Sequence, residues 1–184
     1  TSHAQLFFDD VRLSPEHLLG PEGGGLKLAL TTLGRVRLAQ IGARSVGKSA
    51  RLLDLMLAHA REREQFGHPI GDFQMIQSML ADSAVEINAA RLALLQTDCM
   101  IDQGHDARQQ ISVVKLQASE TLGRIADRAV QVFGGSGYSK ELSIERYYRD
   151  ARIYRIYDGT SEIHRTVIAR ALSDGNRELY DWEV

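Results

Sequence analysis

The chain has 184 residues, of which 43% are hydrophobic, a size that suits one domain with one sizeable core. Its 22 basic and 24 acidic residues give a net charge of −2, which leaves no global field to attract nucleic acid or an anionic membrane. No apolar run reaches the roughly 18 residues that span a bilayer, and no charged-then-apolar leader opens the chain, so we expect a soluble, cytoplasmic protein. A single cysteine, Cys99, excludes an internal disulfide framework, and its helical context predicts a buried thiol.

The first 22 residues predict a short piece of β-structure. Ala4, Leu6 and Phe8 recur at every second position, and a second short apolar stretch precedes Pro15. Strands without partners are only marginally stable. We therefore interpret residues 1–22 as the remnant of a β-domain whose other strands belong to a missing amino-terminal part.

Residues 23–175 predict helices. Pro21 and the glycines from Gly23 to Gly25 mark the boundary. Apolar residues then recur every three or four positions in four long segments, 26–65, 73–103, 106–134 and 160–172, with a short helix at 144–153. Asp106 is the expected N-cap of the segment that begins there. Helices joined by short turns pack antiparallel, so we predict an all-α, four-helix up-down bundle with one short extra helix and a tail at 176–184.

Two stretches carry polar and glycine-rich motifs. The first, REREQFGHPIGDFQ, runs from Arg61 to Gln74 and places a run of mixed charge before Phe66. The second runs from Gln131 to Arg170 and joins a glycine loop, an Arg/Tyr-rich helix and the sequence Asp-Gly-Thr-Ser-Glu that starts at Asp158. Taken alone, these features indicate a solvated helix end, a helix stop and an N-cap at Asp158.

Together and in this order, the two stretches closely resemble the carboxy-terminal helical domain of the flavin-dependent acyl-CoA dehydrogenases. The resemblance spans nearly the whole chain. It implies FAD as cofactor, an acyl-CoA substrate, electron-transfer flavoprotein as the acceptor, a homodimer or homotetramer, and no metal. It also implies that a helical domain on its own is inactive.

The same resemblance makes Asp158 the base that removes the α-proton of an acyl-CoA thioester while hydride leaves the β-carbon for flavin N5. The family's usual acid at this place is Glu, and Asp is one methylene shorter. A misplacement of ~1 Å can cost ~100-fold in rate, so retained activity requires an adjusted loop. Some family members carry the base on the first long helix instead, but residues 29–50 contain no acid, which closes that alternative.

The resemblance also assigns contacts to cofactor and substrate. The cofactor contacts are Arg63, Gln65, Phe66, Gln74, Gln131, Val132, Phe133, Gly134, Gly135, Thr160, Ser161 and Glu162. The substrate contacts are the backbone of Gly159 and an arginine that is either Arg35 or Arg37. Guanidinium geometry suits the phosphate oxygens of FAD, and the amino terminus of the last helix offers free amides.

Two alternatives remain open from the sequence. Nitroalkane oxidases of the same fold also use Asp at this position, so a flavin oxidase of that type is the first alternative. The second is a catalytically silent helical module that serves assembly or binds nucleic acid, because Arg146, Arg149, Arg152 and Arg155 interleave with tyrosines. Acidic neighbours and the neutral net charge favour a structural ion-pair cluster instead, so we expect no nucleic-acid partner.

Overall fold

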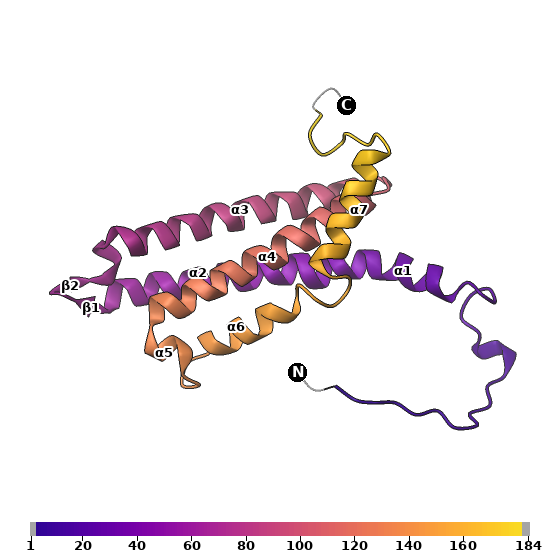
Figure 1. Cartoon of the computed structure of the whole chain (residues 1–184), viewed down its shortest axis with the longest axis horizontal. Coiled ribbons are helices and arrows are strands. Elements are labelled where there is room, and N and C mark those ends of the chain that lie inside the picture. Colours follow the sequence, from indigo (N-terminus) through magenta and orange to yellow (C-terminus); the bar gives the residue numbers. More distant parts are fainter. Residues whose placement is uncertain (1–2, 182–184) are drawn as a thin grey trace. The chain divides into compact units, whose positions relative to one another are not determined.

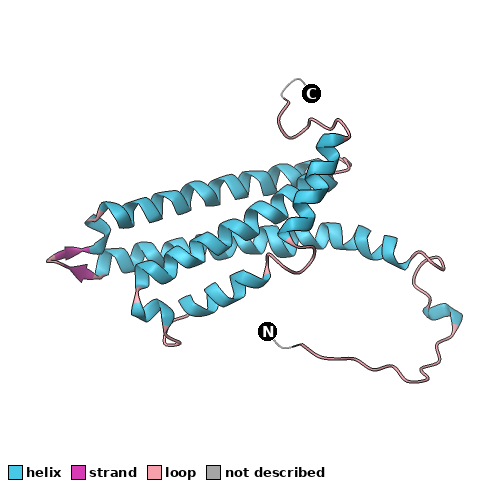
Figure 2. Ribbon diagram, viewed as in Figure 1, coloured by secondary structure: helices cyan, strands magenta, loops and turns pink. Residues whose placement is uncertain are grey.

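The structure, a computed structural model, describes residues 3 to 181, apart from the side chains of Arg35, Val36 and Ala39. It divides into two compact units, with the boundary between Thr32 and Leu33. Helices make up most of the second unit (Figure 1, Figure 2), which confirms the predicted all-α class. The predicted domain boundary at residue 23 remains a prediction.

The first unit contains the 3-10 turn η1 (Pro15–His17) and most of α1 (Gly25–Val36), which runs across the boundary. The strands expected in residues 1–22 do not form among the described residues 3–32. Phe7 and Phe8 are 81% and 80% exposed, so their alternating segment has neither a core to cover nor a neighbouring strand to satisfy its backbone. The assignment of residues 1–22 to a β-domain therefore stays an expectation.

Three long helices form the centre of the second unit. The π-helical segment η2 (Arg37–Ala43) leads into α2 (Arg44–Glu62), which is followed by α3 (Gln74–Asp102) and α4 (Arg108–Phe133). All three helices pack against one another (Figure 1), and the short connections make α3 antiparallel to both α2 and α4. The connection between α2 and α3 contains the antiparallel strands β1 (Glu64–Gln65) and β2 (His68–Pro69) and the 3-10 turn η3 (Ile70–Asp72).

Three further helices pack on α4. They are α5 (Gly135–Tyr138), α6 (Ile144–Ile153) and α7 (Ser161–Ser173). Figure 1 shows that α7 crosses α4 near its start instead of lying along it. The predicted helices are therefore present, but the last one closes the end of the bundle.

The core lies where α4 meets α2 and η2. Leu122 and Ile125 of α4 pack with Leu52 and Met56 of α2, and all four are 0% exposed. The segment η2 can approach α4 closely because residue 42 is glycine: a Cβ there would lie 2.8 Å from Cγ1 of Val114. Since α4 is covered on several sides, several of its polar side chains are buried, among them Lys115, Ser119 and Thr121.

Two local predictions are wrong. Cys99 is exposed on α3, although its neighbours suggested burial. Asp106 does not cap α4, whose N-cap is Ala107; its carboxylate instead pairs with Arg108 at 2.7 Å. Among residues 3–181, none of the helices combines the length and apolar character needed to cross a membrane.

Candidate active-site loop

The connection between α6 and α7, residues 154–160, carries the candidate base; we call it the Asp158 loop. Asp158 has φ 56° and Gly159 has φ 91°, so two successive residues adopt left-handed backbone conformations. Asp tolerates this region better than most residues, and Gly adopts it without steric cost. A Cβ at position 159 would lie 2.9 Å from Nε2 of His164, so the loop also approaches α7 too closely for a larger residue.

The N-cap of α7 is Thr160, whose hydroxyl accepts a hydrogen bond from the backbone N–H of Ile163 at 3.3 Å. Asp158 lies two residues earlier and does not cap the helix. The simple sequence explanation of Asp158 as a cap is therefore wrong, and its carboxylate has no capping role.

Three side chains from three different elements hold the carbonyl oxygens of the Asp158 loop; we call them the carbonyl clamp. Arg37 of η2 donates from Nε to the Asp158 carbonyl at 2.7 Å, and Nε2 of His164 on α7 lies 3.3 Å from the same oxygen. Lys115 of α4 donates from Nζ to the Gly159 carbonyl at 2.5 Å. Because these donors come from η2, α4 and α7, the loop backbone is fixed by the packing of the whole bundle.

Burial governs the charges of this clamp. Lys115 is 0% exposed, and burial lowers its pKa to about 8, although the nearby carboxylate of Asp158 opposes that shift. Burial is also the largest cause that lowers the pKa of His164, so its imidazole is neutral at pH 7. Its Nε2 faces a carbonyl and therefore carries the hydrogen, while Nδ1 is buried without a hydrogen-bond partner among the described residues.

Glu120 of α4 braces the loop at both ends. Its Oε1 accepts a hydrogen bond from the Ser161 hydroxyl at 2.7 Å, and its Oε2 accepts one from Nη1 of Arg155 at 3.2 Å. Ser161 is buried, so its side chain points into the protein rather than to a ligand. Of the three helix-start residues assigned to cofactor, Glu162 is exposed and Thr160 is half-buried.

A second group of predicted cofactor residues lies at the β1–β2 hairpin and just after it. Arg63, Gln65 and Gln74 are exposed, and Phe66 is 91% exposed at the hairpin turn with φ 56°. The Phe66 ring meets Phe73 edge-on, with 6.1 Å between centroids. This surface presents a guanidinium, two amides and an aromatic face to its surroundings.

The glycine loop after α4 lies at the same end of the bundle as the hairpin (Figure 1). The ring of Phe133 stacks on that of His59 with 4.1 Å between centroids, which ties the ends of α4 and α2 together. Gln131, Gly134 and Gly135 are exposed, whereas Val132 is buried in the core. The Val132 side chain therefore cannot contact a cofactor unless the core opens.

The predicted cofactor and catalytic residues thus fall into two groups at opposite ends of α4. At 1.5 Å per residue, Lys115 and Phe133 are separated by about 27 Å along the helix. The Asp158 loop belongs to the first end, and the hairpin and glycine loop belong to the second. Of the two candidate substrate arginines, Arg37 belongs to the carbonyl clamp, and the side chain of Arg35 lies outside the described part.

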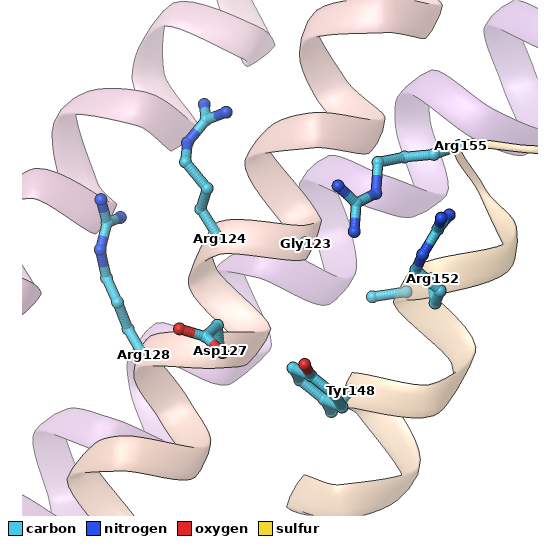
Figure 3. A pocket seen from close by; sticks show the side chains of 8 residues that line it. Gly123, Arg124, Asp127, Arg128, Tyr148, Arg152 and Arg155 are labelled. Carbon is cyan, nitrogen blue, oxygen red and sulfur yellow. The ribbon is translucent and has the colours of Figure 1, made fainter. Parts of the chain in front are cut away.

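A separate pocket, with a volume of about 400 Å³, lies between α4 and α6, and its lining is rich in arginines. Figure 3 shows the charged side chains around it: Arg124, Asp127, Arg128, Arg152 and Arg155. Arg124 and Arg128 both bond to Glu86, and their charges outweigh the effect of burial and lower the pKa of that carboxyl. Arg155 bonds to Glu120. Of the other arginines in the predicted ion-pair cluster, Arg149 bonds to Glu145 at 2.7 Å and Arg146 lies 3.9 Å from Asp150. These pairs support the prediction that the cluster is structural.

The sequence did not predict three residues that hold the Asp158 loop: Lys115, Glu120 and His164. The signal for Lys115 was present, because it follows Ile111 by four residues on the face that Ala118 and Leu122 continue into the core. A lysine at that spacing has to be paired. No residue pattern reveals the role of His164, because its partner is a backbone carbonyl.

The geometry agrees with comparisons to known proteins. The chain matches the family described as "Acyl-CoA dehydrogenase, C-terminal domain" over residues 23–173. It is 44% identical over 169 residues to the probable acyl-CoA dehydrogenase YngJ of Bacillus subtilis (strain 168), covering 92% of this chain and 44% of that protein.

Solved structures give the same result. The butyryl-CoA dehydrogenase of Megasphaera elsdenii superposes with a TM-score of 0.86 and 37% identity, covering 90% of this chain and 43% of that one. A chain from the structure of the electron transferring flavoprotein of Acidaminococcus fermentans also gives a TM-score of 0.86, at 38% identity and with coverage of 90% and 43%. The chain thus spans less than half the length of these relatives, and it belongs to the acyl-CoA dehydrogenase family as its carboxy-terminal domain.

Proposed function

We propose that the complete protein is an FAD-dependent acyl-CoA dehydrogenase in which Asp158 is the base. The observation that carries this proposal is the Asp158 loop, whose carbonyl oxygens are held by Arg37, His164 and Lys115 while Thr160 caps the following helix. Among the described residues, nothing donates a hydrogen bond to the Asp158 carboxylate, and it does not cap α7, so it is available to act on a substrate. A positioned carboxylate within hydrogen-bond reach of the substrate is the requirement for a general base.

The chemistry follows from that position. The Asp158 carboxylate takes the α-proton of the acyl thioester, and the electrons of that C–H bond form the new carbon–carbon double bond as hydride leaves the β-carbon. Bound FAD would accept that hydride, so the acyl chain is oxidised to the 2-enoyl form and the flavin is reduced. A backbone amide of the Asp158 loop is our candidate donor to the thioester carbonyl, whose oxygen gains negative charge as the proton leaves.

The donor set at the other end of α4 fits a flavin dinucleotide. Arg63 supplies a guanidinium for diphosphate oxygens, Gln65 and Gln131 supply amides, and Phe66 offers an exposed aromatic face. A Cβ at Gly135 would meet no atom within 4 Å, so this backbone is open to a ligand. Because this group lies about 27 Å from the Asp158 loop along α4, we propose that the two ends serve different FAD molecules in a homodimer or homotetramer.

A second proposal concerns the protein that accepts the electrons. One similar chain occurs in the structure of the electron transferring flavoprotein of Acidaminococcus fermentans. We infer that the complete protein passes its electrons to a flavoprotein of that kind.

Anaerobic titration of the complete protein with a panel of acyl-CoA thioesters tests this function. A dehydrogenase loses its oxidised-flavin absorbance with at least one thioester and releases the matching 2-enoyl-CoA. Full retention of that absorbance across short, long and branched thioesters would contradict the proposal. Fast reoxidation of the reduced flavin by oxygen would instead indicate an oxidase.

A further inference from the structure

We propose that Lys115 is a positioning residue for the candidate base: its buried ammonium holds the Gly159 carbonyl and so fixes the direction of the Asp158 carboxylate. This inference rests on the proposed function of Asp158, and it adds a residue that the sequence motifs do not contain. Lys115 lies 44 positions from Gly159 in the sequence, and Nζ lies 2.5 Å from the Gly159 oxygen. The hydrogen bond between Lys115 and the Asp158 loop is therefore a tertiary contact.

The burial of Lys115 is costly enough to require an explanation. Lysine is almost never fully buried unless it is paired, yet Lys115 is 0% exposed. Its neighbours on the same face of α4, Ala118 and Leu122, are core residues, so an apolar side chain at position 115 would fit the pattern of the helix. The bundle therefore tolerates a buried lysine at a position from which its ammonium reaches the Asp158 loop.

The contact acts on the backbone next to the candidate base. Gly159 has φ 91° and follows Asp158 at φ 56°, so neither residue is held by a regular helix. Without the carbonyl clamp, rotation about this turn would swing the carboxylate away from the substrate, and a displacement of ~1 Å can cost ~100-fold in rate. Arg37 of η2 and His164 of α7 hold the Asp158 carbonyl oxygen, and Lys115 of α4 holds the Gly159 carbonyl oxygen.

The burial of Lys115 and the charges around it make its hydrogen bond to the Gly159 carbonyl dependent on pH. Five titratable or charged groups surround it: Asp158, Glu120, Glu162, Arg37 and His164. Burial is the largest effect and lowers the pKa of Lys115 to about 8; the three carboxylates oppose that shift and Arg37 adds to it. A charged ammonium makes a stronger hydrogen bond to a carbonyl than a neutral amine does. The hold on Gly159 should therefore weaken as the pH rises through about 8.

Lys115→Met in the complete flavoenzyme tests the proposal, because Met keeps the length of the side chain and removes the donor. We expect the limiting rate of flavin reduction by acyl-CoA to fall by about 10- to 100-fold, with acyl-CoA binding changed less than about 3-fold. We also expect the wild-type rate to decline as the pH rises through about 8, and this decline to be missing in the variant. Amide hydrogen exchange in residues 155–163 should become faster.

Lys48→Met is the matched control. Lys48 of α2 pairs with Asp150 at 3.8 Å and also contacts the Asp158 loop, because it lies over the ring of Tyr154. Among the described residues it bonds to no carbonyl of that loop, so its variant tests the carbonyl contact specifically. Its variant should keep the wild-type pH profile. If Lys115→Met does not fold, Lys115→Gln keeps a neutral donor and should show a reduced rate without the decline near pH 8.

The outcomes separate this inference from the proposed function. A Lys115 variant with the rate, pH profile and amide exchange of Lys48→Met would overturn the positioning role. If Asp158→Asn reduces its flavin as fast as the wild type, the base assignment fails. The amide exchange of residues 155–163 then still decides whether Lys115 holds the loop.

Discussion

Arg37 and Asp158 are 121 positions apart in the sequence, yet Nε of Arg37 donates a hydrogen bond to the Asp158 carbonyl oxygen at 2.7 Å. Arg37 opens the π-helical segment η2, and such segments are frequent at functional sites. The contact joins the beginning of the bundle to the loop that precedes its last helix. The direction of the Asp158 carboxylate therefore depends on tertiary packing as well as on the local turn.

Removing the Arg37 donor should destabilise this region. Arg37→Met leaves the half-buried Asp158 carbonyl without its charged donor, and we expect the free energy of unfolding to fall by about 1–3 kcal/mol. Urea denaturation of the complete protein measures this change. Arg51→Met, at an exposed position of α2, is the control and should stay within about 0.5 kcal/mol of the wild type. Equal stability of the two variants would show that the Arg37 contact contributes nothing.

The glycine loop allows cofactor binding to be separated from folding. A Cβ at Gly135 meets no atom within 4 Å, so Gly135→Val should leave the helix content nearly unchanged and weaken FAD retention by blocking the cofactor. A Cβ at Gly137 would lie 2.7 Å from Phe133 Cβ, so Gly137→Ala should cost about 1–3 kcal/mol of stability. Flavin content and thermal unfolding of both complete variants check this. Undiminished flavin in the stable Gly135 variant would exclude this loop from the cofactor site.

Protonation of His164 should make the stability of the folded protein depend on pH in the acidic range. Burial lowers the pKa of His164 below its ordinary value of 6.5, so the unfolded chain binds a proton there before the folded protein does. The stability from this group is complete above pH 6.5 and is lost as the pH falls through the folded-state pKa. The free energy of unfolding should therefore drop less between pH 7.5 and 5.5 in His164→Gln than in the wild type. The control is His68→Gln, in the exposed hairpin, whose free energy of unfolding should drop over this pH range as much as that of the wild type.

The 184-residue chain expressed by itself should be helical and bind little or no FAD. Its candidate cofactor residues lie at two ends of α4 about 27 Å apart, and both groups include exposed side chains that another part of the assembly has to cover. Circular dichroism and the flavin absorbance per chain measure this. One FAD per purified chain would show that the helical domain holds the cofactor without the rest of the protein.

Local sequence patterns predicted the helices well, because the apolar stripe of α4 from Ile111 to Val132 and the stop at Gly134 depend on spacing within one segment. They predicted strands in residues 1–22 because alternation is also local, whereas strand formation needs a partner. The cap of α7 was misassigned because Asp158 and Thr160 are both good caps, and only the positive φ of Gly159 decides between them. The carbonyl clamp escaped prediction because two of its three contacts join segments far apart in the sequence.

Asp158→Glu tests whether the loop is adjusted to the shorter acid. The longer side chain moves the carboxylate by about one methylene, and Glu adopts a positive φ less readily than Asp. We expect slower flavin reduction or an altered preference for acyl chain length, measured across a series of acyl-CoA thioesters. A faster enzyme with unchanged preference would show that the loop is built for Glu.

The rate of flavin reduction in Asp158→Asn is the most direct measurement of the base assignment. Asn is nearly the same size, tolerates φ 56°, and leaves the cap at Thr160 untouched, so folding and the binding of FAD and acyl-CoA should be preserved. If Asp158 removes the α-proton, anaerobic stopped-flow mixing with the best acyl-CoA will show flavin reduction slowed by several orders of magnitude. Reduction at a rate close to that of the wild type would contradict the account.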